Sequence, residues 1–313
     1  MHKKKNYEVS ILKAEDLPED IINKLSFWSK PTLCKAYAKK DGVNLFYLSV
    51  LINNNIVAIL PIFEKKKYGI TYLVQPPELY YTMIDTFNMD CSTLYKKQNN
   101  NLMILQKIAN HLKKYYFKVM LDLDPSIKDM RAFTWGGYQV SPRYTFTLKL
   151  NIYNSANSTK TMRDDLKKAN ESGLYAKECW DLNAVETLSR SIALRKKRSF
   201  RHCTNGFLDF LDELKELNIC SKVVVYKDDL PIYFATYLKD ISNSCIYALV
   251  SAANETGNKY FSSVFGLDFY FGNNNDFDLF DFTGANTEQV AFFKSKFNCD
   301  LVNYYRIHKK CMV

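Results

Sequence analysis

Two charged residues, Asp281 and Lys294, flank a short segment whose pattern changes from strand-like to helical. Around Asp281 apolar and acidic residues alternate, as in a half-buried strand, and the pattern breaks at Thr283-Gly284. After the break apolar residues recur every three or four positions, which predicts a helix, and Asn286 with Gln289 has the pattern of an N-cap and its reciprocal partner. A carboxylate and an ammonium on such a junction could act on a substrate, or could be surface charges of an ordinary turn.

The net charge of the 313-residue chain is +10, which favours anionic partners such as nucleotide phosphates, tRNA, anionic cell-wall precursors or lipid headgroups. Lysine is abundant throughout the chain, so the net charge alone is a weak signal. Positive charge is concentrated locally only after Ile192, where Arg195, Arg198 and Arg201 lie close together in the sequence. These three arginines are candidates for a phosphate or carboxylate clamp; the alternative is a solvated helix end.

The composition indicates a cytoplasmic protein without a membrane span or a metal site. No apolar run approaches the ~20 residues that cross a bilayer, and the N-terminus has no apolar segment of a secretory signal. The eight cysteines form no CxxC pairs, so we expect small buried side chains in a reducing compartment. The four histidines have no spacing typical of zinc ligands, and we expect no metal.

The order of expected elements, β-α-α-β-β-β-α-β-α-β, occurs twice. Residues 151–161 are rich in Asn, Ser and Thr, so we place a boundary between domains 1–150 and 151–313 there. This order predicts an α+β fold in which each domain is a mixed, mostly antiparallel sheet flanked by helices. Periodicity also predicts a short helix opened by Pro125 and one helix over 259–271, while 78–97 reads as a long surface loop.

Four motifs resemble the FemAB-like branch of the GNAT acyltransferase superfamily. The strand motif T-x-x-L-x-L lies at 145–150, and the helix motif R-x-x-L-x-K-A-x-x-x-G at 163–173. The turn motif D-F-x-G lies at 281–284, and the ending F-K-x-x-F at 293–297. Residues 56–62 and 75–77 are similar to the family's first domain. The resemblance implies two tandem GNAT-like domains, the first bearing the acceptor groove and the second the donor and catalytic site, with the last strand packing back toward the first domain.

The resemblance also implies transfer of an acyl or aminoacyl group to an amine. The aromatic-Lys pair found at the active site of tRNA-dependent members falls on Phe293-Lys294, and there the lysine is thought to stabilise the developing oxyanion. A fixed ammonium in a dry cleft can do so by several kcal/mol. Asp281 could orient Lys294 or accept the proton of the attacking amine, although a carboxylate at a strand end is often only a cap.

The place of the superfamily's pyrophosphate loop falls on residues 253–259, which contain one glycine and an acidic residue. This departs from the Gly-rich loop of acyl-CoA users, although backbone amides at a helix start could still bind an anion. The candidate cofactor-binding residues there are Gly257, Asn258, Lys259 and Tyr260. Tyr80 and Tyr81, on the expected surface loop, could line the acceptor groove.

We therefore expect an N-acyltransferase acting on an amino group of a cell-envelope precursor or polysaccharide. Its donor would be an acyl-CoA or an aminoacyl-tRNA, used as a co-substrate, with no tightly bound cofactor. The charged coiled-coil arm of many tRNA-dependent members has no counterpart, which favours acyl-CoA. The alternatives are a non-catalytic scaffold that binds an anionic ligand and, ranked last, an RNA-binding protein. The chain would have no integral membrane segment, while peripheral membrane contact stays open.

Overall fold

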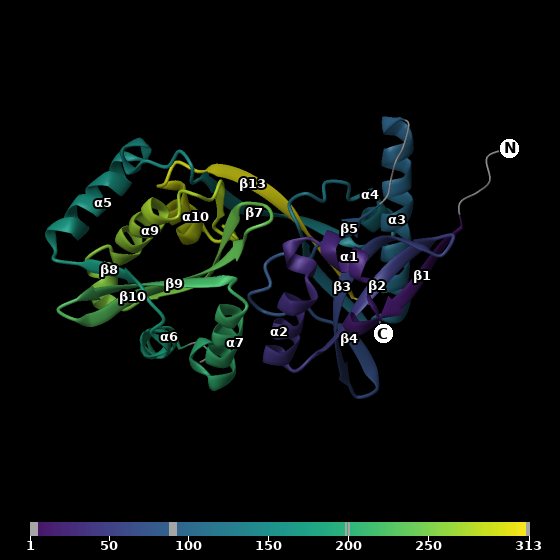
Figure 1. Ribbon diagram of the computed structural model, residues 1–313, viewed down its shortest axis with the longest axis horizontal. Coiled ribbons are helices and arrows are strands. Elements are labelled where there is room, and N and C mark those ends of the chain that lie inside the picture. The colour runs from purple at the N-terminus through teal and green to yellow at the C-terminus, as the bar shows by residue number, and fades with distance from the viewer. Residues whose placement is uncertain (1–5, 88–92, 198, 200, 311–313) are drawn as a thin grey trace. The chain divides into compact units, whose positions relative to one another are not determined.

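The computed structural model describes residues 6–87, 93–197, 199 and 201–310 (Figure 1). The chain forms two compact units: one comprises the residues up to Arg143 together with those from Asn303 onward, and the other spans Tyr144–Val302. Each unit has its own hydrophobic core. The assignment of acceptor binding to one domain and of donor binding and catalysis to the other stays a prediction.

The first unit contains an antiparallel sheet of order β1-β2-β3-β4, with the short β5 paired to β3. Its strands are β1 (Tyr7–Leu12), β2 (Asn44–Ile52), β3 (Asn55–Lys67), β4 (Ile70–Leu73) and β5 (Asp85–Thr86). A tight turn joins β2 and β3, with Asn53 and Asn54 both in the left-handed region that asparagine tolerates.

Four α-helices accompany this sheet: α1 (Glu19–Lys24), α2 (Pro31–Asp41), α3 (Leu94–Tyr115) and α4 (Arg131–Trp135). The long α3 buries one apolar stripe, as its 3.6-residue periodicity predicts, consisting of Ile104, Leu105, Ile108, Ala109 and Leu112. The helix expected at Pro125 is not formed there, and the short helix begins instead at Arg131.

An eight-stranded sheet has the order β6-β13-β7-β12-β11-β10-β9-β8. Its strands are β6 (Lys118–Leu123), β7 (Gln139–Lys149), β8 (Tyr175–Glu178), β9 (Cys220–Lys227), β10 (Leu230–Asp240), β11 (Cys245–Ala253), β12 (Leu279–Asp281) and β13 (Asp300–Lys310). The pairing of β11 with β12 is parallel, whereas β8 to β11, β7 with β12, and β6 with β13 pair antiparallel. The predicted α+β class with mixed, mostly antiparallel sheets is therefore confirmed.

The helices of the second unit lie on both faces of its part of this sheet. Figure 1 shows α5 and α9 on one face of β8 to β10, and α6 and α7 on the other. The bounds are α5 (Lys160–Glu171), α6 (Leu182–Lys196), α7 (Asn205–Glu216), α8 (Glu255–Lys259), α9 (Ser262–Asn273) and α10 (Glu288–Ser295). No helix among the described residues is long and apolar enough to cross a membrane.

The single helix predicted over 259–271 is two helices, α8 and α9, because the chain turns at Phe261. Phe261 is in the left-handed region, with φ 56°, and therefore cannot continue a right-handed helix. Gly257 in α8 packs directly on β10: a Cβ there would lie 2.3 Å from the carbonyl oxygen of Ile232. The close contact between α8 and the sheet thus requires glycine at this position.

Candidate active site

Lys294 lies near the end of α10 and reaches back to the turn that follows β12. Its Nζ donates hydrogen bonds to the carbonyl oxygen of Phe282, at 2.5 Å, and to that of Gly284. Burial disfavours the ammonium and lowers the pKa of Lys294 from 10.5 to about 8, although the negative charge of Asp281 acts in the opposite direction. The sequence-predicted lysine is thus a half-buried, titratable group on the strand-turn-helix junction.

The turn that holds Lys294 has an unusual backbone. Thr283 and Gly284 both have positive φ, 51° and 95°, so two successive residues lie outside the usual right-handed and extended regions. The Thr283 hydroxyl donates to the carbonyl oxygen of Ala248 on the neighbouring strand β11, at 2.5 Å. This geometry points the carbonyls of Phe282 and Gly284 toward the ammonium of Lys294.

Asp281 organises this turn from the end of β12. Its buried Oδ1 accepts hydrogen bonds from the Thr145 hydroxyl, at 2.6 Å, and from the backbone N–H of Thr283, at 2.7 Å. The Thr145 oxygen in turn accepts from the backbone N–H of Gly284, at 3.1 Å. The carboxylate therefore fixes the peptide groups to which Lys294 binds, and it raises the pKa of Lys294 through its charge.

The N-cap predicted at Asn286 is wrong. The helix N-cap is Thr287, and no side chain caps it. Asn286 instead bonds across to β7: its Oδ1 accepts from the backbone N–H of Tyr144 at 2.9 Å, and its Nδ2 donates to the carbonyl oxygen of the same residue at 3.3 Å. Asn286 therefore ties the loop before α10 to the strand beside β12.

Phe293, the aromatic partner of Lys294 in the sequence, is half-buried and packs against the core of the second unit. Its ring meets that of the buried Phe297 edge to face, with centroids 5.8 Å apart. Phe297 also contacts Phe271 and Phe282. Phe293 thus belongs to the aromatic cluster that anchors α10 and holds Lys294 in place.

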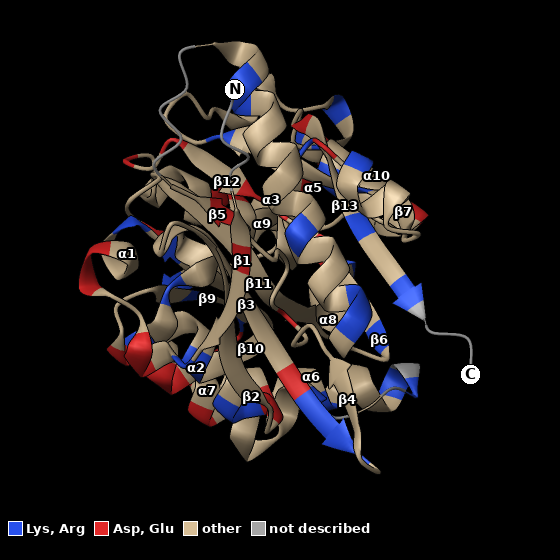
Figure 2. Ribbon diagram, turned by 90° about the vertical axis from the view of Figure 1, so that its right-hand side faces the viewer, with Lys and Arg blue, Asp and Glu red and all other residues tan. Residues whose placement is uncertain are grey.

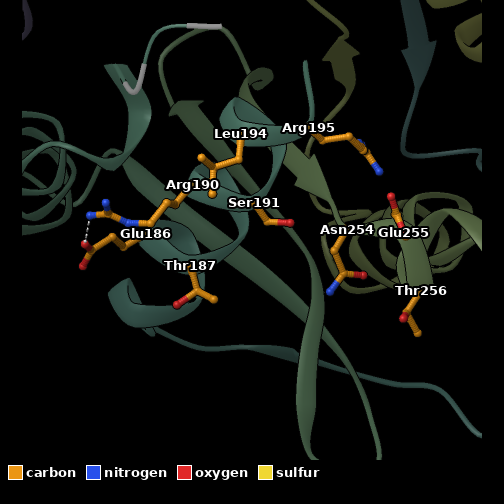
Figure 3. A pocket seen from close by; sticks show the side chains of 9 residues that line it. All are labelled: Glu186, Thr187, Arg190, Ser191, Leu194, Arg195, Asn254, Glu255 and Thr256. Carbon is orange, nitrogen blue, oxygen red and sulfur yellow. Dashed lines mark hydrogen bonds and ion pairs between the residues drawn. The ribbon is translucent and has the colours of Figure 1, made fainter. Parts of the chain in front are cut away.

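A cavity of about 740 Å³ lies between α6 and the start of α8 (Figure 3). Its lining residues from α6 stand on one side, and Asn254, Glu255 and Thr256 on the other. The α6 residues are Glu186, Thr187, Arg190, Ser191, Leu194 and Arg195. Arg190 forms an ion pair with Glu186 at 2.8 Å. Arg195, one of the predicted clamp residues, lines the cavity from the C-terminal end of α6. The cavity thus brings a predicted cation next to the predicted phosphate loop.

The predicted cofactor residues Gly257 to Tyr260 follow this cavity, but their amides are engaged within the protein. The N–H of Gly257 donates to the Asn254 side chain at 2.8 Å, that of Asn258 to the Asn254 carbonyl, and that of Tyr260 to the Thr256 carbonyl. Lys259 is exposed, with its Nζ 5.2 Å from the centroid of the Tyr260 ring. The geometry therefore gives no support to an anion site on these three amides.

The remaining predicted binding residues have different environments. Arg201 is exposed and lies against the His202 ring, with Nε 3.3 Å from Nε2, while Arg198 lies outside the described residues. The expected surface loop is wrong for Tyr81, which is buried in the first unit between Trp28 and Tyr304. Tyr80 is half-buried. Tyr81 is therefore a core residue and not an exposed groove residue.

Sequence reasoning missed three residues that shape the site. Thr145 stands out in the sequence only as part of a strand motif, yet it bridges Asp281 and Gly284. Asn254 is the N-cap of α8, and its side chain accepts a hydrogen bond from the N–H of Gly257. An asparagine directly before a helix is a sequence signal that could have indicated this role. Thr187 lines the cavity from the middle of α6 and carries no signal that distinguishes it from other helix residues. Among the described residues, no cluster of His, Cys, Asp and Glu could hold a metal ion.

The fold matches solved structures, although no family model and no curated protein match the sequence. FemX aligns with a TM-score of 0.64 at 11% identity, covering 95% of this chain and 96% of FemX. The C-terminal domain of a putative lysylphosphatidylglycerol synthetase from Agrobacterium fabrum aligns with a TM-score of 0.61 at 9% identity, covering 93% and 90%. A tandem GNAT protein from the clavulanic acid biosynthesis pathway gives 0.53 at 9% identity, covering 97% and 98%.

These similarities define the class of fold: the chain has a tandem GNAT-like fold. The resemblance to the FemAB-like branch is thereby confirmed at the level of the fold, over nearly the whole chain.

Proposed function

We propose that the protein is a FemAB-like N-acyltransferase that moves an acyl or aminoacyl group onto an amine. The observation that carries the proposal is the half-buried ammonium of Lys294, held by two carbonyls of the turn after β12 within a tandem GNAT-like fold. The acceptor would be an amino group of a cell-envelope precursor or polysaccharide. The donor would be an acyl-CoA thioester or an aminoacyl-tRNA ester.

In this reaction the amine nitrogen attacks the carbonyl carbon of the donor and forms the new C–N bond. Negative charge develops on the carbonyl oxygen, and the intermediate collapses as the C–S or C–O bond breaks and the nitrogen loses a proton. The Lys294 ammonium has three N–H groups, and two of them are used by Phe282 and Gly284. The third can donate to the developing oxyanion, an interaction that is strong where water is excluded.

The α6–α8 cavity supports a donor that carries phosphate groups. Arg195 lines it, and the phosphate groups of both CoA and tRNA suit an arginine. Because the amides of Gly257, Asn258 and Tyr260 donate elsewhere, we expect side chains such as Arg195 to contribute more to phosphate binding than this part of the backbone. Asp281 then acts as a positioning residue for the turn.

The experiment is a transfer assay with two labelled donor classes, acetyl-CoA and charged tRNA. The acceptors are glucosamine and a UDP-linked muropeptide, and each donor is also tested alone for thermal stabilisation of the protein. We expect label to appear on an amine with one donor class, and that class alone to raise the melting temperature. The Arg195→Gln variant should then weaken donor binding.

A scaffold that binds an anionic ligand without turnover is the second candidate. Arg195 in the α6–α8 cavity could bind such a ligand, and the bonds of Lys294 to Phe282 and Gly284 also fit a lysine with a structural role alone. It predicts stabilisation by CoA or tRNA with no label on any acceptor. That result would refute the transferase proposal for these donors and acceptors.

A further inference from the structure

Seven lysines gather at one end of the first unit, around the β3–β4 hairpin. They are Lys65, Lys66, Lys67, Lys113, Lys114, Lys118 and Lys309. Thr71 of β4 pairs with Lys66 and accepts a hydrogen bond from the N–H of Phe117, next to Lys118. Figure 2 shows blue at the arrowhead ends of β3 and β13 and along α3. We call this group the lysine end.

The lysines of β13 and α3 join the same group. Lys309 pairs with Val119 of β6, one residue from Lys118, whose side chain points to the opposite face of the same end of the sheet. The Nζ atoms of Lys309 and Lys113 both lie within 4.0 Å of the position that a Cβ on Gly137 would occupy. Positive charge is therefore dense here, although these side chains come from four separate elements.

None of these seven ammonium groups forms an ion pair with a described residue. Some lysines elsewhere in the described residues do form ion pairs, as Lys40 does with Glu78 and Lys296 with Asp165. The acidic residue next to the hairpin lysines, Glu64, is half-buried and accepts a hydrogen bond from the Tyr116 hydroxyl at 2.5 Å. Among the described residues, contacts with tyrosine rings accompany Lys67, Lys114 and Lys309, but no carboxylate pairs with the lysine end, which suits an anionic partner.

The tip of the hairpin carries an aromatic residue in an unfavourable backbone conformation. Tyr68 has φ 52° and is followed by Gly69 at 74°, as in a turn with two left-handed residues. The corresponding turns in this protein use Asn53-Asn54 and Asp228-Asp229, whose short polar side chains tolerate this region. The Tyr68 side chain is 89% exposed and the centroid of its ring lies 5.1 Å from the Nζ of Lys67, so among the described residues it contacts a neighbouring lysine and is not part of the hydrophobic core.

Other large apolar groups accompany Tyr68 at this end. Ile70 is 39% exposed directly across the turn, and Tyr115 is 55% exposed at the end of α3. A tyrosine ring and an isoleucine flanked by lysines match the interface of a bilayer, where aromatic rings sit at headgroup level and ammonium groups meet anionic lipids. Single-stranded nucleic acid would favour a groove with successive stacking rings, whereas Tyr68 and Tyr115 lie on separate elements.

We propose that the lysine end, led by the tip of the β3–β4 hairpin, binds the surface of a membrane containing anionic phospholipids. The Tyr68 ring and Ile70 enter the interfacial region, and the lysines contact the headgroups. This inference concerns the first unit and does not depend on the transfer reaction, so a failure of either proposal leaves the other standing.

The test is co-sedimentation of the full chain with vesicles of phosphatidylcholine alone, or with about one third phosphatidylglycerol. We expect binding to the anionic vesicles only, and weaker binding at high salt. The triple variant Lys65→Gln/Lys66→Gln/Lys67→Gln should lower the partition coefficient about 100-fold, since each lysine near an anionic surface contributes about tenfold or less. The matched control, Lys160→Gln/Lys167→Gln/Lys168→Gln on α5, removes the same charge and should change binding less than about threefold.

Two further variants separate the tip from general charge. Tyr68→Asn suits the left-handed backbone, so we expect an unchanged or higher melting temperature together with weaker vesicle binding. The tryptophan fluorescence that Tyr68→Trp adds to the protein should shift to shorter wavelength when anionic vesicles are present. The proposal is overturned if the wild type does not sediment with anionic vesicles, or if both triple variants lose binding equally. It is also overturned if RNA binds the lysine end and displaces the vesicles while the emission of the Tyr68→Trp variant stays unshifted.

Discussion

The ammonium of Lys294 is half-buried, and two main-chain carbonyls hold it. Its pKa of about 8, lowered from 10.5, means that the neutral amine is more favourable relative to the ammonium in the folded protein than in water. Near neutral pH the ammonium still predominates, and in the proposed reaction its third N–H donates to the substrate oxygen. A neutral Lys294 could instead act as a general base. The pH dependence of the rate therefore distinguishes stabilisation of the oxyanion from base catalysis.

We expect the transfer rate at saturating substrate to fall as the pH rises through about 8. The reason is that the proton lost from Lys294 is the one that stabilises the oxyanion. A rising limb at lower pH would report deprotonation of the acceptor amine. The measurement is kcat between about pH 6 and about pH 10; a rate that keeps rising through this range would assign Lys294 as a base instead.

Asp281→Asn should shift this falling limb to lower pH, because the Asp281 charge raises the pKa of Lys294. The amide oxygen can still accept from Thr145 or Thr283, so we expect the protein to fold with a moderately lower melting temperature. Comparing the pH profiles of kcat for wild type and variant tests this. An unshifted profile with a lower kcat would mean that Asp281 acts on the turn geometry alone.

At the scale of elements, α8 is positioned by its contact with β10. Gly257→Ala should destabilise the protein by about 1–3 kcal/mol, because the new methyl group would overlap the Ile232 carbonyl oxygen and α8 would have to shift. Gly272→Ala in α9 is the matched control: nothing lies within 4 Å of its Cβ, and we expect a gain of about 0.5 kcal/mol. Urea unfolding of both variants measures the difference. Equal stabilities would show that α8 moves freely on the sheet.

The strand-turn-helix around Lys294 was predictable because alternation and helical periodicity are local signals. Its detailed contacts were not: Lys294 binds main-chain carbonyls, which have no signature in the sequence. The Asn286 side chain bonds to Tyr144, a residue distant in the chain, so a local capping pattern gave the wrong partner. The break at Phe261 was also hidden, because an apolar residue there continues the helical period.

At the scale of the molecule, the repeated element order predicted the α+β class and, with the motifs, the tandem GNAT-like fold. The sequence predicted less well where periodicity is absent. Tyr81 belongs to an irregular segment that resembles a surface loop, yet its side chain packs in the core beside Trp28. Irregular backbone can be buried when individual aromatic side chains pack singly, and this arrangement leaves no periodic pattern to recognise.

The stability of the whole protein should depend on pH through a second buried lysine. Lys222 of β9 is 1% exposed, its Nζ makes no hydrogen bond with any residue that the structure describes, and it lies 4.9 Å from the centroid of the Trp180 ring. Burial lowers its pKa from 10.5 to about 8. At pH values between about 8 and 10.5, Lys222 is protonated in the unfolded chain and neutral in the folded protein. The free energy of unfolding therefore rises with pH in this range.

Lys222→Met should therefore stabilise the protein at neutral pH, by about 1–2 kcal/mol, and reduce the rise in stability between pH of about 8 and 10.5. Urea unfolding at several pH values measures both effects. A variant less stable than the wild type at neutral pH would show that the Trp180 ring and nearby carboxylates compensate the buried ammonium fully.

The central claim is that the Lys294 ammonium stabilises the transition state of acyl transfer. Its most direct test is the single-turnover transfer rate of Lys294→Met, measured with the donor and acceptor identified for the wild type. We predict a loss of about 100- to 1,000-fold in this rate, with donor binding and melting temperature close to those of the wild type. Lys167→Met, an exposed lysine on α5, should leave the rate unchanged. A Lys294→Met protein that is folded, binds donor and transfers at the wild-type rate would contradict the claim.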